Sequence, residues 1–562
     1  MDLIDIIRKH VLKNAFDYGK AQPGSIVGKV IGEYPDAKKD MKKTMAEISK
    51  ECTRVNTLSK DKIEKEMQNY VYEEKKIEEK KLTIPNAMPG KVVVRFPPEP
   101  NGYPHIGHAK AALLSQAIVE EYGGKFILRW DDTNPEKESE EYVGAIKKDM
   151  QWLGLKFDEE IYASDWMPKL YDLQVQLFKQ NDAYICTCDS EKISEMRMKQ
   201  KPCPCRAHST ADNLKRWEEM LNGKAKAGTC VVLLKGQLES NNTAMRDPSL
   251  WRILEAEHYR QKNKYRVWPT YDFEGAVMDS LTGTTHALRS KEYDLRNETY
   301  MFLLDKLKLR KPELISISRL AIKGAPISKR ALKPLVESGK LWGWDDPRLP
   351  TLAGLRRRGV LPQAIKNFVL QFGISKVESE PSWERLLVEN RKLTEPTAPH
   401  YFAVINPVEV IVVGLPQEEK SGVKKVHGHD VKYENKFYIS KLDADTIKTG
   451  ETFRLKEHYN LKVIKKDHEL LECEYAGFDL IPGSKKIQWV SAKTKEHTNC
   501  TIYALSELLN DAEEFNEKSL VINTAKCQNA CTKLNNGDII QFERIGLCKL
   551  DNKEKMQFIL IG

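Results

Sequence analysis

The chain has 562 residues, of which 41% are hydrophobic and 30% are charged, and its formal net charge is +9. This length predicts about three to five domains, and no apolar run approaches the roughly 18 residues that a membrane-spanning helix needs. Eleven cysteines in so long a chain favour a reducing compartment, the cytoplasm, over a disulfide-bonded secreted protein. The amphipathic start, M-D-L-I-D-I-I-R-K-H, has neither a long apolar core nor a cleavage site, so we do not interpret it as a signal peptide.

The first 85 residues predict helices with many charges. One basic cluster comprises Lys38, Lys39, Lys42 and Lys43, and the run E-E-K-K-I-E-E-K-K from Glu73 to Lys81 alternates blocks of opposite charge. A solvated surface is the favoured interpretation of both features, and a tether is the alternative for the second.

The stretch Lys91–His108 reads K-V-V-V-R-F-P-P-E-P-N-G-Y-P-H-I-G-H. Its apolar run predicts a buried strand, its prolines and Gly102 predict a loop, and apolar spacing from His105 onward predicts a helix. A helix start carries unpaired N–H groups and partial positive charge, which suit phosphate. His105 and His108 add donors for oxygens that gain charge in a transition state, and Gly107 leaves room for a flat ring.

An isolated H-x-x-H is more often an ordinary helix start. The whole stretch, however, resembles the HIGH signature of class I aminoacyl-tRNA synthetases, in the form shared by glutamyl and glutaminyl enzymes of archaea and eukaryotes. The resemblance implies a multidomain protein with an α/β Rossmann-type core and C-terminal all-β barrels. Its expected parts are a helical extension (1–88), two halves of the catalytic domain (89–185 and 261–330), an inserted acceptor-end-binding domain (186–260), a helical stem-contact domain (331–396) and a β-barrel anticodon-binding domain (397–562).

A second strand is predicted at Phe126–Leu128, and it is followed by the carboxylates of D-D-T-N. Ligands of open parallel sheets bind outside the carboxyl ends of the strands, so Asp131 and Asp132 are placed to face an ammonium group. Turn and N-cap chemistry is the alternative. The run resembles the family motif R-F-D-D-T-N-P, with Trp130 replacing phenylalanine, and this resemblance assigns the substrate α-amino group to Asp131.

Four cysteines, at positions 186, 188, 203 and 205, form two C-x-C pairs separated by fourteen residues. Cys186, Cys188, Cys203 and Cys205 offer the four thiolates that a tetrahedral, structural zinc site requires. Reduced cysteines without a metal are the alternative, and His208 is a candidate substitute for one thiol.

The parallel sheet is expected to resume in Tyr265–Phe273, Y-R-V-W-P-T-Y-D-F, which T-T-H-A-L-R-S-K-E-Y follows. By resemblance, Tyr271, Arg289 and Arg95 line the amino-acid pocket. A buried γ-carboxylate needs a cation with paired donors, which a guanidinium supplies and a neutral amide does not require. Glutaminyl enzymes usually lack the arginine at position 289, so the pattern favours glutamate. The alternative for Arg289 is an ion pair, for example with Glu292.

The sequence I-S-K-R at 327–330 resembles the KMSKS loop of the family, with Pro326 where a first lysine would stand. The resemblance places Lys329 against the ATP phosphates, with Lys323 and Arg330 as further candidates for that charge. Alone, this tripeptide pattern is weak. The predicted ATP-binding residues are Pro98, His105, Gly107, His108, Ile327, Ser328, Lys329 and Arg330, and the predicted catalytic residues are His105, His108 and Lys329.

Residues 331–395 predict helices, and Arg356–Arg358 suit either backbone phosphates or a solvated basic face. Short apolar runs such as Val408–Val413, Phe437–Ile439 and Ile539–Phe542 then predict β-barrels. The resemblance implies ligation of L-glutamate to tRNA(Glu) with ATP and Mg²⁺, in a monomer, and leaves tRNA(Gln) and a protein partner of the N-terminal extension open. Glutaminyl-tRNA synthetase is the nearest alternative, and an inactive RNA-binding derivative is the second.

Overall fold

A computed structural model describes the chain except for residues 1, 19–20, 59, 71–81, 327–328 and 511. The charged run at 73–81 and the predicted ATP-binding residues Ile327 and Ser328 therefore lie outside the described residues. Residues 1–80 and 81–562 form two separate compact units. Among the described residues, no helix is long and apolar enough to cross a membrane.

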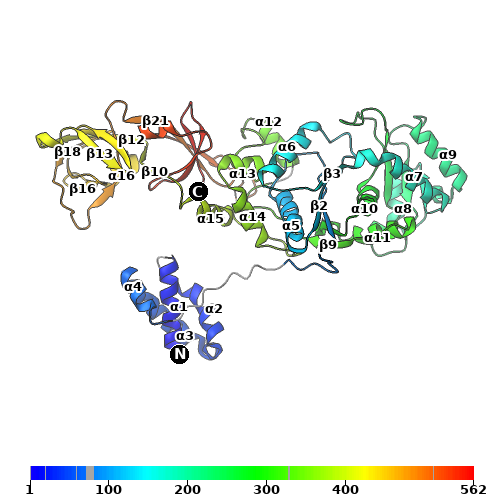
Figure 1. The fold of residues 1–562 in the computed structure, drawn as a ribbon, viewed down its shortest axis with the longest axis horizontal. Helices are drawn as coiled ribbons and strands as arrows, with labels where there is room; N and C mark the ends of the chain where they lie inside the picture. Colours follow the sequence, from blue (N-terminus) through cyan, green and yellow to red (C-terminus); the bar gives the residue numbers. More distant parts are fainter. Residues whose placement is uncertain (1, 19–20, 59, 71–81, 327–328, 511) are drawn as a thin grey trace. The chain divides into compact units, whose positions relative to one another are not determined.

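The N-terminal unit is helical, as its sequence predicts (Figure 1). Asp40 caps the third helix by accepting a hydrogen bond from the backbone of Lys43 at 3.0 Å. Apolar residues of every helix meet in one core, while the four clustered lysines remain exposed, as the surface interpretation requires. The elements are α1 (Leu3–Tyr18), α2 (Pro23–Glu33), the 3₁₀ helix η1 (Pro35–Asp40), α3 (Met41–Val55) and α4 (Lys60–Met67).

The second unit begins with the predicted strand–loop–helix, and its strand β1 lies at the centre of a parallel sheet. Strand β1 pairs with β2, and β2 pairs with β3, each in parallel. On its other side β1 adjoins β8, because Thr285 N donates to Val93 O at 2.8 Å, and β8 pairs in parallel with β9. The chain therefore changes direction across the sheet between β1 and β8, where such sheets bind ligands. These elements are β1 (Val92–Phe96), α5 (Ile106–Tyr122), β2 (Gly124–Trp130), α6 (Glu140–Trp152), β3 (Glu159–Tyr162), β8 (His286–Ser290), α11 (Arg296–Leu307) and β9 (Glu313–Ile317).

Between β3 and β8 the chain builds a four-stranded antiparallel sheet, in the order β4-β5-β6-β7. The expectation that 265–273 rejoins the parallel sheet is wrong, because β7 pairs with β6. A short apolar run has the same pattern in either kind of sheet. The elements here are η2 (Ala163–Trp166), α7 (Met167–Lys179), β4 (Ala183–Cys186), α8 (Ser190–Met198), η3 (Pro204–Ala207), α9 (Thr210–Leu221), β5 (Val231–Leu234), η4 (Thr243–Met245), β6 (Ser249–Ile253), β7 (Val267–Pro269) and α10 (Tyr271–Leu281), and η5 (Lys291–Tyr293) follows β8.

The predicted helical segment after residue 328 joins the parallel sheet to the C-terminal sheets. The three adjacent arginines are neither free for phosphate nor simply solvated: Arg356 pairs with Asp149 at 2.7 Å, Arg357 pairs with Asp551 at 2.9 Å, and Arg358 donates to the carbonyl of Ile561. These contacts hold α13 against α6, which carries Asp149, and against the C-terminal part of the chain, which carries Asp551 and Ile561. The helices are α12 (Lys329–Glu337), α13 (Leu352–Arg358), α14 (Pro362–Leu370) and α15 (Trp383–Thr394).

The C-terminal part contains two seven-stranded sheets in barrel-like arrangements, with orders β10-β23-β24-β25-β21-β22-β11 and β19-β16-β17-β18-β12-β15-β20. The strands predicted at 408–413, 437–439 and 539–542 are confirmed. The elements are β10 (His400–Tyr401), β11 (Ala403–Ile405), β12 (Pro407–Val413), η6 (Gln417–Glu419), β13 (Gly422–Val426), β14 (His429–Tyr433), β15 (Lys436–Ser440), α16 (Lys441–Thr446), β16 (Thr452–Leu455), β17 (Asn460–Lys466), β18 (Leu470–Tyr475), β19 (Lys485–Ile487), β20 (Val490–Ser491), β21 (His497–Leu505), β22 (Leu520–Gln528), η7 (Asn529–Lys533), β23 (Ile539–Phe542), β24 (Gly546–Asn552) and β25 (Gln557–Leu560).

Candidate active site

Helix α5 begins with two histidines that cap the backbone of its first turn. The Nδ1 atom of His105 accepts from Gly107 N at 3.1 Å, and Nδ1 of His108 accepts from His105 N at 3.2 Å. Because each Nδ1 is an acceptor, we assign the ring proton to Nε2 in both imidazoles. Burial lowers the pKa of His108 to about 4 and holds the pKa of His105 well below its usual value. Both rings are therefore neutral N–H donors near pH 7.

The loop before α5 is held from two directions. Ile106 N donates to Pro350 O at 3.0 Å, and Leu352 N donates to Pro104 O at 2.9 Å. Pro98 O accepts from Asp131 N at 3.2 Å, which joins the first motif to the second. A Cβ at Gly107 would lie 2.9 Å from Cε1 of His105, so a side chain there would displace the capping ring.

Lys329, the first residue of α12, reaches this loop. Its Nζ donates to Asn101 O at 3.0 Å and to the hydroxyl of Tyr142 at 2.8 Å. Both partners are neutral, and no carboxylate lies within 4.0 Å of Nζ among the described residues. Arg330 and Lys323 are exposed nearby in sequence. The predicted phosphate cation and the predicted phosphate-binding helix start are thus brought together, with the charge of Lys329 uncancelled.

Arg289, near the carboxyl end of β8, is a buried guanidinium surrounded by aromatic rings. It is 6% exposed, and its Cζ lies 4.9 to 5.7 Å from the ring centroids of Tyr300, Tyr293 and Tyr271. Its Nη1 donates to Asn297 Oδ1 at 2.6 Å, while its buried Nε has no partner among the described residues. Glu292, the alternative partner, pairs with Arg319 instead. Among the described residues no carboxylate lies within 4.0 Å of Arg289, so its charge is available to an acidic ligand.

Arg95 lies in the same part of the sheet but is engaged by the protein. Its Nε and Nη2 donate to Asp279 at 2.7 and 3.1 Å, and its Nη1 donates to Leu288 O at 2.7 Å. Asp279 also accepts from Arg129 at 2.5 Å, and the two guanidinium groups hold its pKa below the usual range despite burial. Arg95 therefore holds Asp279 and β8 in position, and this role is separate from any contact that it makes with a ligand.

Asp131 and Tyr271 complete the predicted pocket. Both oxygens of Asp131 accept from Arg129, at 2.6 and 3.1 Å, so its remaining lone pairs are those left for an ammonium group. The phenol of Tyr271 lies within electrostatic reach of Arg289, Arg95, Asp131 and Asp279, and burial raises its pKa. The structure thus gathers the predicted amino-acid-binding residues around one phenol.

No role was predicted for Arg129, Asp279 or Asn297. Asp279 follows an apolar run on α10, A-V-M-D, and a charge within a buried helical face is a signal of pairing. Arg129 is the arginine of the second motif itself. Asn297 had no signal in the sequence, because its role depends on the contact with Arg289.

The four cysteines of the C-x-C pairs form one cluster. Their Sγ atoms all lie within 4.8 Å of one another, and Cys203 Sγ lies 3.4 Å from that of Cys186 and 3.3 Å from that of Cys188. Zinc–sulfur bonds are about 2.3 Å long, so four thiolates at this spacing fit one tetrahedral ion. His208 is outside the cluster, and its Nδ1 lies 3.2 Å from Ile185 O.

Three family descriptions match successive parts of the chain. The catalytic domain of class I tRNA synthetases (E and Q) matches residues 91–395, and two anticodon-binding domains of the same class match residues 398–476 and 486–551. The chain belongs to the class I tRNA synthetases of the E and Q group. This membership accounts for the Rossmann-type core and the C-terminal sheets.

Relatives of this E and Q synthetase resemble it over their whole length. Glutamate--tRNA ligase of Nitrosopumilus maritimus is 42% identical over 98% of this chain and 98% of its own. Those of Cenarchaeum symbiosum and Pyrococcus abyssi are each 36% identical, over 99% and 100% of this chain and 99% of their own.

Proposed function

We propose that this synthetase is a glutamate--tRNA ligase, which activates L-glutamate with ATP and transfers it to tRNA(Glu). The observation that carries the proposal is the buried Arg289, whose guanidinium has no carboxylate partner within 4.0 Å among the described residues. An isolated buried cation is costly unless a ligand pairs with it. A glutamate γ-carboxylate supplies that partner, and the names of the archaeal relatives support the same substrate.

In the first step, an oxygen of the glutamate α-carboxylate attacks the α-phosphorus of ATP, and the bond to pyrophosphate breaks. The Nε2–H groups of His105 and His108 donate to oxygens that gain charge, and Lys329 neutralises the leaving phosphates. Mg²⁺ accompanies ATP and adds positive charge at the phosphates. No protein nucleophile is needed, because positioning and charge stabilisation are sufficient.

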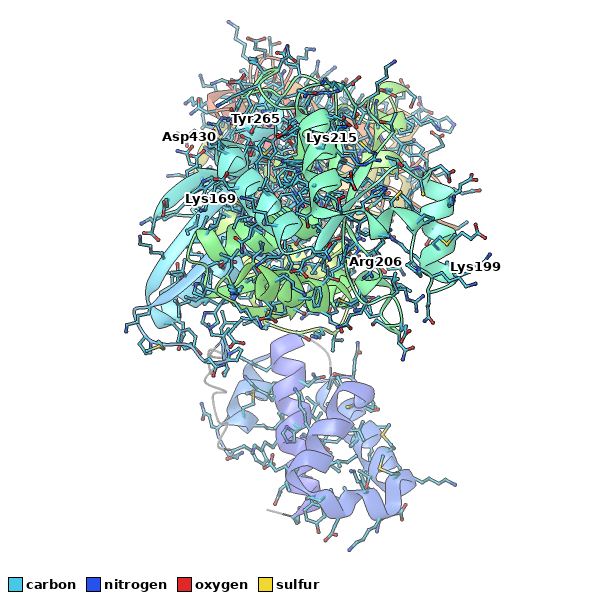
Figure 2. All side chains as sticks on the ribbon, turned by 90° about the vertical axis from the view of Figure 1, so that its right-hand side faces the viewer. Lys169, Lys199, Arg206, Lys215, Tyr265 and Asp430 are labelled. Carbon is cyan, nitrogen blue, oxygen red and sulfur yellow. The ribbon has the colours of Figure 1, made fainter. Side chains whose placement is uncertain are left out.

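In the second step, the 2′-hydroxyl of the terminal adenosine attacks the activated carbonyl, and AMP leaves. In this proposal residues 186–260 bind the acceptor end of the tRNA, residues 331–396 bind its stem, and residues 397–562 bind its anticodon. The protein is proposed to act as a monomer in the cytoplasm. Matches to anticodon-binding domains support the last assignment. Figure 2 turns α7, α8 and α9 towards the viewer. Exposed Lys199 after α8 and Lys215 on α9 lie in the inserted part, and exposed Lys169 lies on α7 just before it, which supports contact with RNA phosphates. The N-terminal extension is proposed to bind another protein.

The function is tested by aminoacylation of purified tRNA(Glu) and tRNA(Gln) with each amino acid. We expect glutamate to be attached to tRNA(Glu), and the same assay reports whether tRNA(Gln) is also a substrate. Charging with glutamine alone would identify a glutaminyl enzyme. Binding of tRNA without charging would identify an inactive derivative.

The pH profile tests the protonation state of the two histidines. Because burial keeps the pKa of His108 near 4, both rings stay neutral as the pH falls through about 6.5, the ordinary pKa of histidine. We expect the rate of adenylate formation to show no inflection from these rings between about pH 5.5 and 7.5. An inflection in this window that is absent from His108→Asn would contradict a neutral donor.

We also propose that Cys186, Cys188, Cys203 and Cys205 hold a structural zinc ion. Elemental analysis of the purified chain should find about one zinc per molecule, since all four positions of a tetrahedral site are filled by protein. Cys203→Ser should lose the metal and lower the melting temperature, because metal binding contributes to folding. Cys230→Ser, outside the cluster, is the matched control. Equal zinc content in both variants would refute the site.

A further inference from the structure

One carboxyl group in the amino-acid pocket has no role in the motifs discussed so far. Glu274 lies in the first turn of α10 and is 1% exposed. Its Oε1 is buried and has no hydrogen-bond partner among the described residues, and it lies 4.0 Å from Nε of Arg129. The same Nε atom donates to Asp131, the predicted ligand of the substrate amino group, at 2.6 Å, so the two carboxyl groups converge on one guanidinium. A buried acid in this position needs an explanation.

We propose that Glu274 is a positioning residue whose carboxyl group carries a proton and donates it in a hydrogen bond to Asp131, which keeps the pocket selective for an acidic amino acid. This inference rests on the proposed use of glutamate. It adds to that proposal a residue that acts through Asp131 and does not itself contact the substrate.

The geometry decides which of the two carboxyl groups keeps the proton. Two carboxylates that lie beside one guanidinium and are excluded from water cannot both ionise without a large cost in free energy. Asp131 accepts hydrogen bonds from Arg129 on both oxygens, at 2.6 and 3.1 Å, so it is the ionised member. Glu274 lies 4.0 Å from the same guanidinium.

The surroundings of Glu274 act in both directions. Burial and the charge of Asp131 raise the pKa of Glu274 well above its ordinary value, and Asp279 of its own helix adds to this rise. Arg129 on β2 opposes the rise, as does the positive end of α10. Arg95 on β1 and Tyr300 on α11 are both hydrogen-bonded to Asp279.

A neutral Glu274 has a consequence for substrate choice. The pocket holds the guanidinium groups of Arg95, Arg129 and Arg289 and the carboxylates of Asp131 and Asp279. Arg95 and Arg129 pair with these carboxylates, whereas Arg289 has no carboxylate within 4.0 Å among the described residues, so the γ-carboxylate of glutamate would be its partner. An ionised Glu274 would add negative charge to the pocket and weaken this preference, and a neutral amide would then compete better.

Two substitutions separate a proton-carrying role from a charged one. In Glu274→Gln, an amide N–H replaces the carboxyl O–H without a charge, so the KM for L-glutamate should stay within about threefold of the wild type. In Glu274→Met, the donor is lost from a side chain of similar length, so that KM should rise at least about tenfold while the KM for ATP stays constant. Each KM is measured by aminoacylation of tRNA(Glu) with the full chain, and Asp305→Asn, a surface carboxylate that pairs with Lys311, is the control.

Each outcome bears on the inference. A KM for glutamate that changes more than about fivefold in Glu274→Gln, in either direction, would mean that the wild-type group is ionised. Equal losses for glutamate and ATP in Glu274→Met, or no loss at all, would mean that the residue only packs the core, and the melting temperature of each variant identifies failure to fold. If the wild-type chain itself does not attach glutamate, the proposed function fails, whereas a failure of this inference leaves wild-type charging intact.

Discussion

Replacing Arg289 with cysteine is expected to raise the KM for L-glutamate about a hundredfold or more and to leave the KM for ATP nearly unchanged. The guanidinium is buried among three tyrosines and fixed by Asn297. Removing one member of a buried ion pair costs about 2 to 5 kcal/mol, because the other charge is left without a partner. Each 1.4 kcal/mol corresponds to about a tenfold change in binding. Steady-state aminoacylation, with each substrate varied in turn, measures both constants.

Two further variants make the Arg289 result specific. Arg289→Lys keeps the positive charge but loses the planar pair of donors, so its KM for glutamate should lie between those of the wild type and the cysteine variant. Arg391→Ala removes an arginine on α15 that pairs with Glu384 and should leave the KM values for glutamate and ATP unchanged. A similar loss for glutamate and ATP in Arg289→Cys would instead assign Arg289 a structural role.

The strand–loop–helix at 91–108 was predictable from sequence because its signals are local. Apolar runs, prolines and helical spacing act over a few residues, and the structure has β1, the loop and α5 where these signals place them. The grouping of Tyr271 with Arg289 was predicted from the resemblance to glutamyl enzymes, because their motifs carry these two residues. In the structure these two side chains share one aromatic site.

The partners of the charged residues were not predictable in the same way. Arg95 pairs with Asp279 across 184 positions of sequence, and no local pattern encodes such a contact. Residues 265–273 joined the antiparallel sheet because neighbouring strands, not the run itself, decide pairing. The triple arginine of α13 reads as a phosphate site in sequence, yet each member finds a partner within the protein. In each case the prediction missed a contact between segments that are distant in sequence.

Replacing Lys329 with alanine is expected to slow adenylate formation about a hundredfold to a thousandfold, with little change in the KM for glutamate. Removing one preorganised group that stabilises transition-state charge typically has an effect of this size. Pyrophosphate exchange, measured with and without tRNA(Glu), follows this step directly. Lys333→Ala, one turn further along α12 and paired with Glu337 at the surface, is the matched control. An unchanged rate in Lys329→Ala would remove this residue from the catalytic set.

The resting contacts of Lys329 explain why so large an effect is expected from an exposed side chain. Its ammonium group is held by a carbonyl and a hydroxyl, both neutral, and faces the aromatic ring of Tyr142 at 4.5 Å. Transfer of this charge to the phosphates of ATP therefore breaks no ion pair among the described residues. The cost of the movement is small, and most of the electrostatic attraction remains to stabilise the charge that develops on the leaving pyrophosphate.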